Sequence, residues 1–275
     1  MALQDMVSAI MREVAEDVVR PRFCMLGADD IAEKSPGEIV TCVDHEAEIR
    51  LQDRLAGLGL GARIVGEEAA SRDPRLLDDL DRGLVWLIDP LDGTANFAAG
   101  RRPFGMMVAL VADGTVQEGW LLDPLSGRLC HARRGQGATC DRLPVRAAGT
   151  GLFPPRATLG TQFLSAGRRA RVLEGARALA VVPIPRCAAE SYARLVLGED
   201  DIALYQRILP WDHAAGVLFL EEAGGRATHW DGSPFRIGSP GVGVLAAASP
   251  ALWDIAAAAL LTPATGLARM ENAVL

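Results

Sequence analysis

The chain has 275 residues, 49% of them hydrophobic and 23% charged, with a formal net charge of −7 and a pI near 5.2. This composition is typical of a globular fold, and the negative charge argues against non-specific nucleic-acid binding, which depends on a basic surface. The sequence has neither the continuous apolar run of a membrane span nor an N-terminal signal-peptide core, so we expect a cytoplasmic protein.

Two residue counts bear on the chemistry of the chain. The five cysteines are odd in number and have no CxxC spacing, which indicates neither a disulfide framework nor a zinc site; we expect buried free thiols. The chain has 27 arginines but only one lysine, Lys34. A single lysine in such a chain is a candidate for a role that arginine cannot perform.

The first half of the chain predicts helices packed on an antiparallel or mixed sheet. Apolar residues at helical spacing predict a helix over residues 3–18 that ends before Pro21, and the segment GADDIAEKSPGE after it is typical of a mobile loop. The elements predicted next are a strand at 39–41, a helix at 44–58, a strand within ARIVGEE (62–68), and strands at 84–88, 105–111, 115–122 and 128–132.

The pattern changes after RAAGTGLFPP (146–155), a segment rich in Gly and Pro. We therefore predict an N-terminal α+β metal-binding domain over residues 1–148 and a C-terminal α/β domain over 149–275, with the site in the cleft between them. Predicted strands lie near 157–160, 182–186, 201–205 and 243–247, and predicted helices near 166–180, 188–197, 212–223 and 250–261.

Acidic residues follow the ends of predicted strands or open a helix. They are Asp44 after IVT, Glu67 after ARIVG, Asp89 and Asp92 after LVWLI, and Asp212 in PWDHAAG. Carboxylates at strand ends can converge, and Mg²⁺ prefers oxygen ligands, among them a carbonyl such as that of Leu91. Taken singly, Asp44 and Asp212 could be helix N-caps and Glu67 part of a solvated turn. Asp89 and Asp92 fit that alternative poorly, because a buried strand gains nothing from two unpaired acids.

Gly93 and Thr94 directly follow these acids. If a helix begins there, its free N–H groups form an anion site, and glycine lets the backbone approach a phosphate closely. The alternative, an Asx-type turn, explains the Asp-Gly step but not the pair of acids.

Three segments in this order, GEE, DPLDGTANF and PWDHAAGVLFLEEAGG, resemble the signatures of the inositol monophosphatase family of magnesium-dependent, lithium-sensitive sugar phosphatases. IVTCVDHEAE and RRGQGA are similar to two further family segments. The resemblance implies an α/β (α+β) fold with two sheets in five αβαβα layers, a homodimer, two or three Mg²⁺ ions, and a small phosphorylated metabolite as substrate.

The resemblance also implies roles for individual residues. The implied metal ligands are Glu67, Asp89, the carbonyl of Leu91, Asp92 and Asp212. The implied substrate contacts are Leu91, Asp92, Gly93, Thr94, Tyr205 and Asp212. A magnesium-activated water, oriented by Glu67 and Thr94, is expected to attack phosphorus in line. Asp44 would hydrogen-bond Thr94, and Lys34 falls where the family has an active-site lysine.

The substrate is less well defined than the family. Tyr205 stands where inositol-selective members carry a glutamate, and RCAAESY lacks the usual Gly-Ser or Gly-Thr. Glu190 either replaces that glutamate or occupies an exposed helix position. The alternatives are fructose-1,6-bisphosphatase, histidinol-phosphate phosphatase or nucleotide 3'-phosphatase activity, or a non-enzymatic role associated with RNA and transcription. The filled metal positions and the acidic charge favour a phosphomonoesterase.

Overall fold

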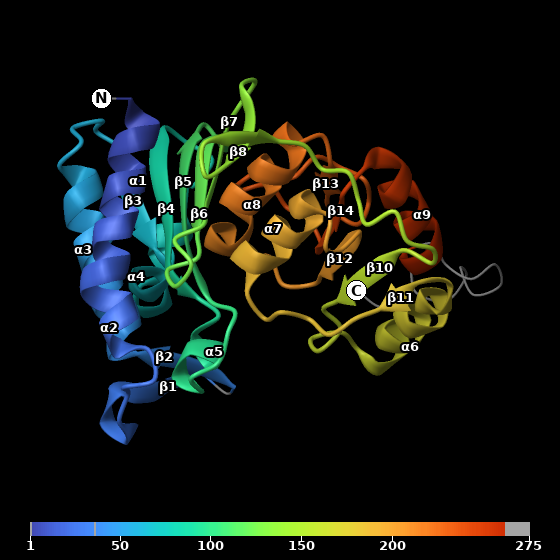
Figure 1. Cartoon of the computed structure of the whole chain (residues 1–275), viewed down its shortest axis with the longest axis horizontal. Helices are drawn as coiled ribbons and strands as arrows, with labels where there is room; N and C mark the ends of the chain where they lie inside the picture. The colour runs from blue at the N-terminus through green and yellow to red at the C-terminus, as the bar shows by residue number, and fades with distance from the viewer. Residues whose placement is uncertain (1, 36, 262–275) are drawn as a thin grey trace.

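The computed structural model describes residues 2–35 and 37–261, and in it two sheets alternate with three layers of helices (Figure 1). The outer layer on one side holds α1 and α3, the middle layer α7 and α8, and the outer layer on the other side α6 and α9. The five-layer αβαβα arrangement expected from the sequence is confirmed. The α-helices are α1 (Leu3–Val14), α2 (Arg20–Arg22), α3 (Cys42–Ala56), α4 (Glu67–Arg72), α5 (Thr94–Ala98), α6 (Ala166–Gly175), α7 (Ala188–Leu197), α8 (Pro210–Glu222) and α9 (Pro250–Leu260).

The N-terminal segment differs from its prediction in two places. The first helix continues from α1 through a π-helical turn, Ala15–Val19, into α2, so the prediction that it ends before Pro21 is wrong. Proline removes one helical hydrogen bond and crowds the preceding turn, and here the wider π turn directly precedes it. The prediction of a mobile loop over residues 27–38 is also wrong. The segment contains most of an antiparallel hairpin of β1 (Ile31–Ser35) and β2 (Glu38–Thr41).

The larger sheet has the order β3-β4-β5-β6-β7-β8-β9, in which β3 and β4 are parallel and the other neighbours antiparallel. Its strands are β3 (Arg63–Gly66), β4 (Leu84–Asp92), β5 (Gly105–Ala112), β6 (Thr115–Leu122), β7 (Leu129–Arg133), β8 (Gly137–Cys140) and β9 (Leu143–Val145). Alternate side chains of β4 enter different cores: Trp86 packs on the α1–α3 side and Leu87 on the α7–α8 side. The continuous apolar run at 84–88 therefore lies in a strand that is covered on both faces.

The smaller sheet has the order β11-β10-β12-β14-β13. Its strands are β10 (Arg156–Leu159), β11 (Ala180–Val181), β12 (Ile202–Tyr205), β13 (Arg226–Thr228) and β14 (Val244–Ala247). The strand predicted at 182–186 is wrong, because Pro183 and Pro185 cannot donate to a ladder, and only residues 180–181 pair. One buried cluster in the middle layer contains side chains from both sheets and from α8.

Candidate active site

Three of the expected acidic residues meet at the end of the larger sheet. Glu67 begins α4 directly after β3, Asp89 lies on β4, and Asp212 is in the first turn of α8. One carboxylate oxygen from each residue lies within 4.8 Å of those from the other two. Because β3 and β4 are parallel, their carboxyl ends share one edge, and the start of α8 is packed beside it. Residues far apart in the sequence thus form one cluster.

Burial and mutual repulsion disfavour the charged forms of these carboxylates. Burial, followed by the charge of Glu67, raises the pKa values of Asp89 and Asp212 well above the usual range. Burial also raises the pKa of Glu67 to about 7, although Lys34 opposes the shift. A cluster made only of oxygen donors, with excess negative charge in a buried place, has the chemistry that a hard divalent cation requires.

Lys34 contributes the ammonium group nearest this cluster. Its Nζ lies 2.5 Å from Glu67 Oε1 and 2.9 Å from Glu68 Oε1, so the lysine reaches the acids from strand β1. Burial lowers the pKa of Lys34, but the two glutamates outweigh this effect and raise it above its usual value. The lysine therefore stays charged and positions the Glu67 carboxylate.

Asp44 links helix α3 to Thr94. Thr41 caps α3, and Asp44, the third helical residue, accepts hydrogen bonds from Thr41 N at 2.8 Å and Thr41 Oγ1 at 2.5 Å. Its other oxygen accepts from Thr94 Oγ1 at 2.8 Å. Burial raises the pKa of Asp44 to about 6. Asp44 is therefore not an N-cap, and neither is Asp212, because the N-cap of α8 is Leu209.

Asp92 is held by the first turn of α7. Its Oδ2 accepts from Ala189 N at 2.6 Å and contacts Cys187 Sγ at 3.1 Å. It does not belong to the group of three mutually close acids, although its charge contributes to the raised pKa values of Asp89 and Asp212. Sequence reasoning missed Cys187 as a contact of Asp92. The absence of the family's Gly-Ser or Gly-Thr in RCAAESY was the signal that could have drawn attention to this position.

Leu91 and Gly93 shape the turn between β4 and α5. Leu91 N donates to Asp89 Oδ1 at 3.1 Å, and Leu91 O lies 3.0 Å from Thr94 Oγ1. Gly93 has φ of +84°, and a Cβ there would lie 3.2 Å from the carbonyl oxygens of Arg186 and Pro103. Both the backbone conformation and the close approach therefore require glycine.

Glu48 is a second residue that sequence reasoning missed. This buried side chain of α3 accepts from Glu68 N at 2.7 Å and from Ala69 N at 2.8 Å, so it caps α4 from outside. A Cβ on Gly66 would collide with its carboxylate at 2.2 Å. Glu48 thus fixes the helix start that carries Glu67. The segment GEE identified Gly66, Glu67 and Glu68 in the sequence, but it did not indicate their contact with Glu48.

Tyr205 lies at the end of β12 among aromatic rings. Its ring stacks on Tyr192 with centroids 5.5 Å apart and meets His213 edge-on at 4.9 Å. Its hydroxyl is buried. Burial raises the pKa of Tyr205, and the charge of Asp92 adds to the shift. The contact of Tyr205 with substrate stays a prediction.

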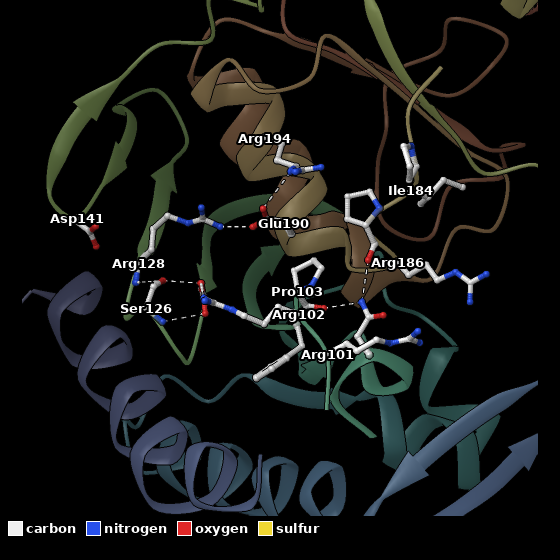
Figure 2. A pocket seen from close by; sticks show the side chains of 15 residues that line it. Arg101, Arg102, Pro103, Ser126, Arg128, Asp141, Ile184, Arg186, Glu190 and Arg194 are labelled. Atoms are coloured by element: carbon white, nitrogen blue, oxygen red, sulfur yellow. Dashed lines mark hydrogen bonds and ion pairs between the residues drawn. The ribbon is translucent and has the colours of Figure 1, made fainter. Parts of the chain in front are cut away.

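Beside α5 and α7 lies a cavity of about 950 Å³, rich in arginine (Figure 2). Glu190 lines it and is paired with Arg128 at 2.5 Å and with Arg194 at 3.3 Å. Glu190 is therefore not the exposed helix residue considered above, since only 18% of its side chain is accessible. Asn96 also lines the cavity, and its side-chain amide donates to Pro103 O at 2.7 Å and Pro185 O at 2.9 Å.

Comparisons with known proteins agree on one family. The profile described as "Inositol monophosphatase family" matches residues 4–262. The inositol-1-monophosphatase of Bacillus subtilis (strain 168) is 32% identical over 212 residues, which are 73% of this chain and 76% of the relative. The fructose-1,6-bisphosphatase/inositol-1-monophosphatase of Thermotoga maritima is 30% identical over 209 residues, 75% of this chain and 78% of the relative.

Solved structures give the same result for the fold. The extragenic suppressor protein SuhB of Bartonella henselae superposes with a TM-score of 0.80 and 22% identity, covering 96% of this chain and 100% of that one. An inositol monophosphatase from Zymomonas mobilis gives a TM-score of 0.77 and 25% identity, with coverage of 94% and 99%. Within residues 2–35 and 37–261, no helix has both the length and the apolar character needed to cross a membrane.

Proposed function

Because the chain belongs to the inositol monophosphatase family and is a phosphoric monoester hydrolase, we propose that it hydrolyses small polyol and sugar phosphates with the help of magnesium. The observation that carries the proposal is the cluster of Glu67, Asp89 and Asp212, each of which places one carboxylate oxygen within 4.8 Å of the other two. Acids this close together, with one buried and two half-buried, are stable as anions only beside a cation.

The residues that would hold magnesium are Glu67, Asp89, Asp212, the carbonyl of Leu91 and Asp92. We propose two or three ions, because five oxygen donors spread over one strand and two helix starts are more than one ion needs when substrate and water complete its shell. When bound, magnesium supplies Lewis acidity toward phosphoryl oxygens and lowers the pKa of water.

The chain's own groups orient the reactants. Asp44 accepts a hydrogen bond from the Thr94 hydroxyl, which directs the lone pairs of Thr94 away from Asp44. When the attacking water gives a proton to Thr94, the hydroxyl proton of Thr94 would pass to the Asp44 carboxylate. Glu67, held by Lys34, is the second group that we propose to orient this water. The backbone N–H groups at the start of α5, next to its N-cap Gly93, form the proposed phosphate contact.

We propose broad acceptance among these substrates. A site that pairs a substrate hydroxyl with a buried acid rejects analogues strongly, whereas Tyr205 offers no carboxylate at that place. The Thermotoga maritima relative is named for two activities, which supports including fructose 1,6-bisphosphate among the candidates. A regulatory role without catalysis is less well supported, because every expected metal position carries an oxygen donor.

The test is a panel of phosphates assayed with magnesium. Inositol 1-phosphate, glycerol 2-phosphate, fructose 1,6-bisphosphate, histidinol phosphate and a nucleoside 3'-phosphate are compared by kcat/KM. We expect magnesium-dependent phosphate release, with polyol and sugar phosphates within about one or two orders of magnitude of each other. A strong preference for inositol 1-phosphate alone would contradict broad acceptance, and no release from any of them would contradict the proposed function.

We further propose a homodimer located in the cytoplasm, on the strength of the family resemblance. Sedimentation velocity of the purified chain tests the assembly, and a single species with the mass of one chain would contradict it. Fractionation of the producing cells tests the location.

A further inference from the structure

The cysteines of the larger sheet lie opposite each other. Cys130 on β7 and Cys140 on β8 are direct partners in the antiparallel register. Directly opposed residues have Cα atoms about 4.5 or 5.5 Å apart, depending on the type of pair, and both values lie inside the range that disulfides occupy. Opposed side chains also point to the same face of a sheet. The backbone therefore already has the geometry of a cross-linked pair.

The two sulfur atoms are in contact. The Sγ atoms lie 3.8 Å apart, with the Cys130 thiol donating to Cys140. Rotation about the Cα–Cβ bonds is enough to shorten a contact of this length to the 2.03–2.05 Å of an S–S bond, because the strands themselves need not move. The other cysteines have different neighbours: the sulfur atoms of Cys24, Cys42 and Cys187 contact oxygens of Gly100, Asp30 and Asp92.

The environments of the two thiols differ. Cys130 is 1% exposed and belongs to the core between the sheets, whereas Cys140 is half-buried at the end of β8. The hydrogen bond from Cys130 lowers the pKa of Cys140 to about 7 and raises that of Cys130. Cys140 is thus the partner that solvent can reach, and it has thiolate character near neutral pH.

We propose that Cys130 and Cys140 form a peroxide-driven oxidation site that closes to an intramolecular disulfide. The Cys140 thiolate attacks a hydroperoxide; the O–O bond breaks, the sulfur becomes a sulfenic acid, and the leaving oxygen takes up a proton. The Cys130 thiol then attacks this sulfur, forms the S–S bond and releases water. Two thiols and one hydroperoxide give one disulfide, one water and one alcohol, or a second water when the oxidant is hydrogen peroxide.

The sequence between the cysteines makes the product easy to identify. Native full-length protein is exposed to stoichiometric hydrogen peroxide, remaining thiols are alkylated, and the chain is digested with trypsin. Trypsin cuts after Arg128, Arg133, Arg134 and Arg142, so the cross-link joins peptide 129–133 to peptide 135–142. We expect this two-chain peptide, a loss of two hydrogen atoms from the intact mass, and three alkylated thiols in place of five.

Matched variants separate this site from the exposed cysteines. The double variant Cys24→Ser/Cys42→Ser should give the same two-chain peptide. Cys130→Ser should stop at a Cys140 sulfenic acid that dimedone traps, and dithiothreitol should restore the wild-type thiols. A Cys140 that proceeds to sulfinic acid in the wild type, or disulfides that form only between chains, would overturn the proposal. The wild-type peptide map gives this answer even if a variant does not fold.

Discussion

The carboxylates of the candidate site differ in their contacts, and these contacts determine what the removal of each carboxylate should do. Asp44 accepts from Thr41 and Thr94, so it supports both the start of α3 and the orientation of a hydroxyl. Asp212 is half-buried, and its charge is disfavoured by loss of solvent and by Glu67. Removing the Asp212 charge relieves repulsion, whereas removing the Asp44 carboxylate leaves the donors of Thr41 and Thr94 without an acceptor.

The first prediction concerns Asp212→Asn. This change removes one proposed metal ligand without opening a cavity, so turnover should fall by about two orders of magnitude or more while the melting temperature of the metal-free protein stays equal or rises. Steady-state kinetics at saturating magnesium and thermal denaturation measure both effects. Asp254→Asn, at a largely exposed acid on α9, is the control and should change neither. Near-wild-type turnover of the Asp212 variant would remove this residue from the ligand set.

The second prediction concerns the only lysine. Its compact ammonium group contacts two glutamate oxygens, and the larger planar guanidinium of arginine cannot take the same position between them. Lys34→Arg should lower kcat about tenfold or more with little change in melting temperature. The reverse exchange at an exposed arginine, Arg50→Lys, is the control. Equal activity of the Lys34 variant would show that charge alone matters there.

At the scale of elements, the pattern of apolar residues predicted the main helices and strands of the layers. The elements that it did not predict depend on contacts between segments that are distant in the sequence. The apolar run 84–88 marked β4 correctly because both faces of that strand are covered. The strand predicted at 39–41 corresponds to β2, but β1 was missed, because its five residues are all exposed or half-buried and show no apolar alternation, and β2 is its only partner in the sheet. The short strands β8, β9 and β13 were also absent from the prediction, since three or four residues carry too little periodicity.

Much of the site was predictable from local sequence pattern, as the layers were. Strand ends followed by acids identify Glu67 and Asp89, and their meeting with Asp212 follows from the parallel pair β3–β4 and the start of α8. The contacts of Glu48 and Cys187 could not be inferred, because they join residues 20 and 95 positions apart in the sequence. Local pattern contains no information about such pairs.

The third prediction tests the packing of α8 on the larger sheet. A Cβ on Gly119 of β6 would lie 2.8 Å from the Cα of Ala215, so Gly119→Ala must push α8 away and should cost about 1–3 kcal/mol of stability. Gly167 in α6 has nothing within 4 Å of its Cβ position, and Gly167→Ala should be neutral or stabilise by up to about 1 kcal/mol. Urea denaturation of both variants measures the difference. Equal stabilities would contradict the close approach.

At the scale of the whole molecule, the middle helical layer joins the two sheets. The cluster on this layer includes residues of both, and the segment 146–155 connects β9 to β10. The division into domains 1–148 and 149–275 stays a prediction from composition. Limited proteolysis that cuts first within 146–155 and leaves two stable fragments would support it.

The fourth prediction is the pH dependence of metal-free stability. The folded-state pKa of Glu67, about 7, lies above its unfolded value of about 4.3, so the folded state holds the proton more tightly. The stability of the metal-free protein should therefore fall as pH rises between these values and through 7. Denaturation in EDTA should show a larger loss from pH 6 to pH 8 in the wild type than in Glu67→Gln, by up to about 1 kcal/mol. A loss of the same size in both proteins would contradict the shift.

Asp92 lies at the end of β4, yet its carboxylate is fixed by Ala189 and Cys187, and Asp212 comes from α8. The site therefore needs residues from both sides of the segment 146–155. We expect neither part of the chain to be active when it is produced alone. A gene cut within the codons for 146–155 should yield two inactive products that regain activity when they are produced together in one cell. A recombinant that joins the first stretch of this chain to the second stretch of a distant relative should be active only where the contacts at positions 187 and 189 with Asp92 are preserved.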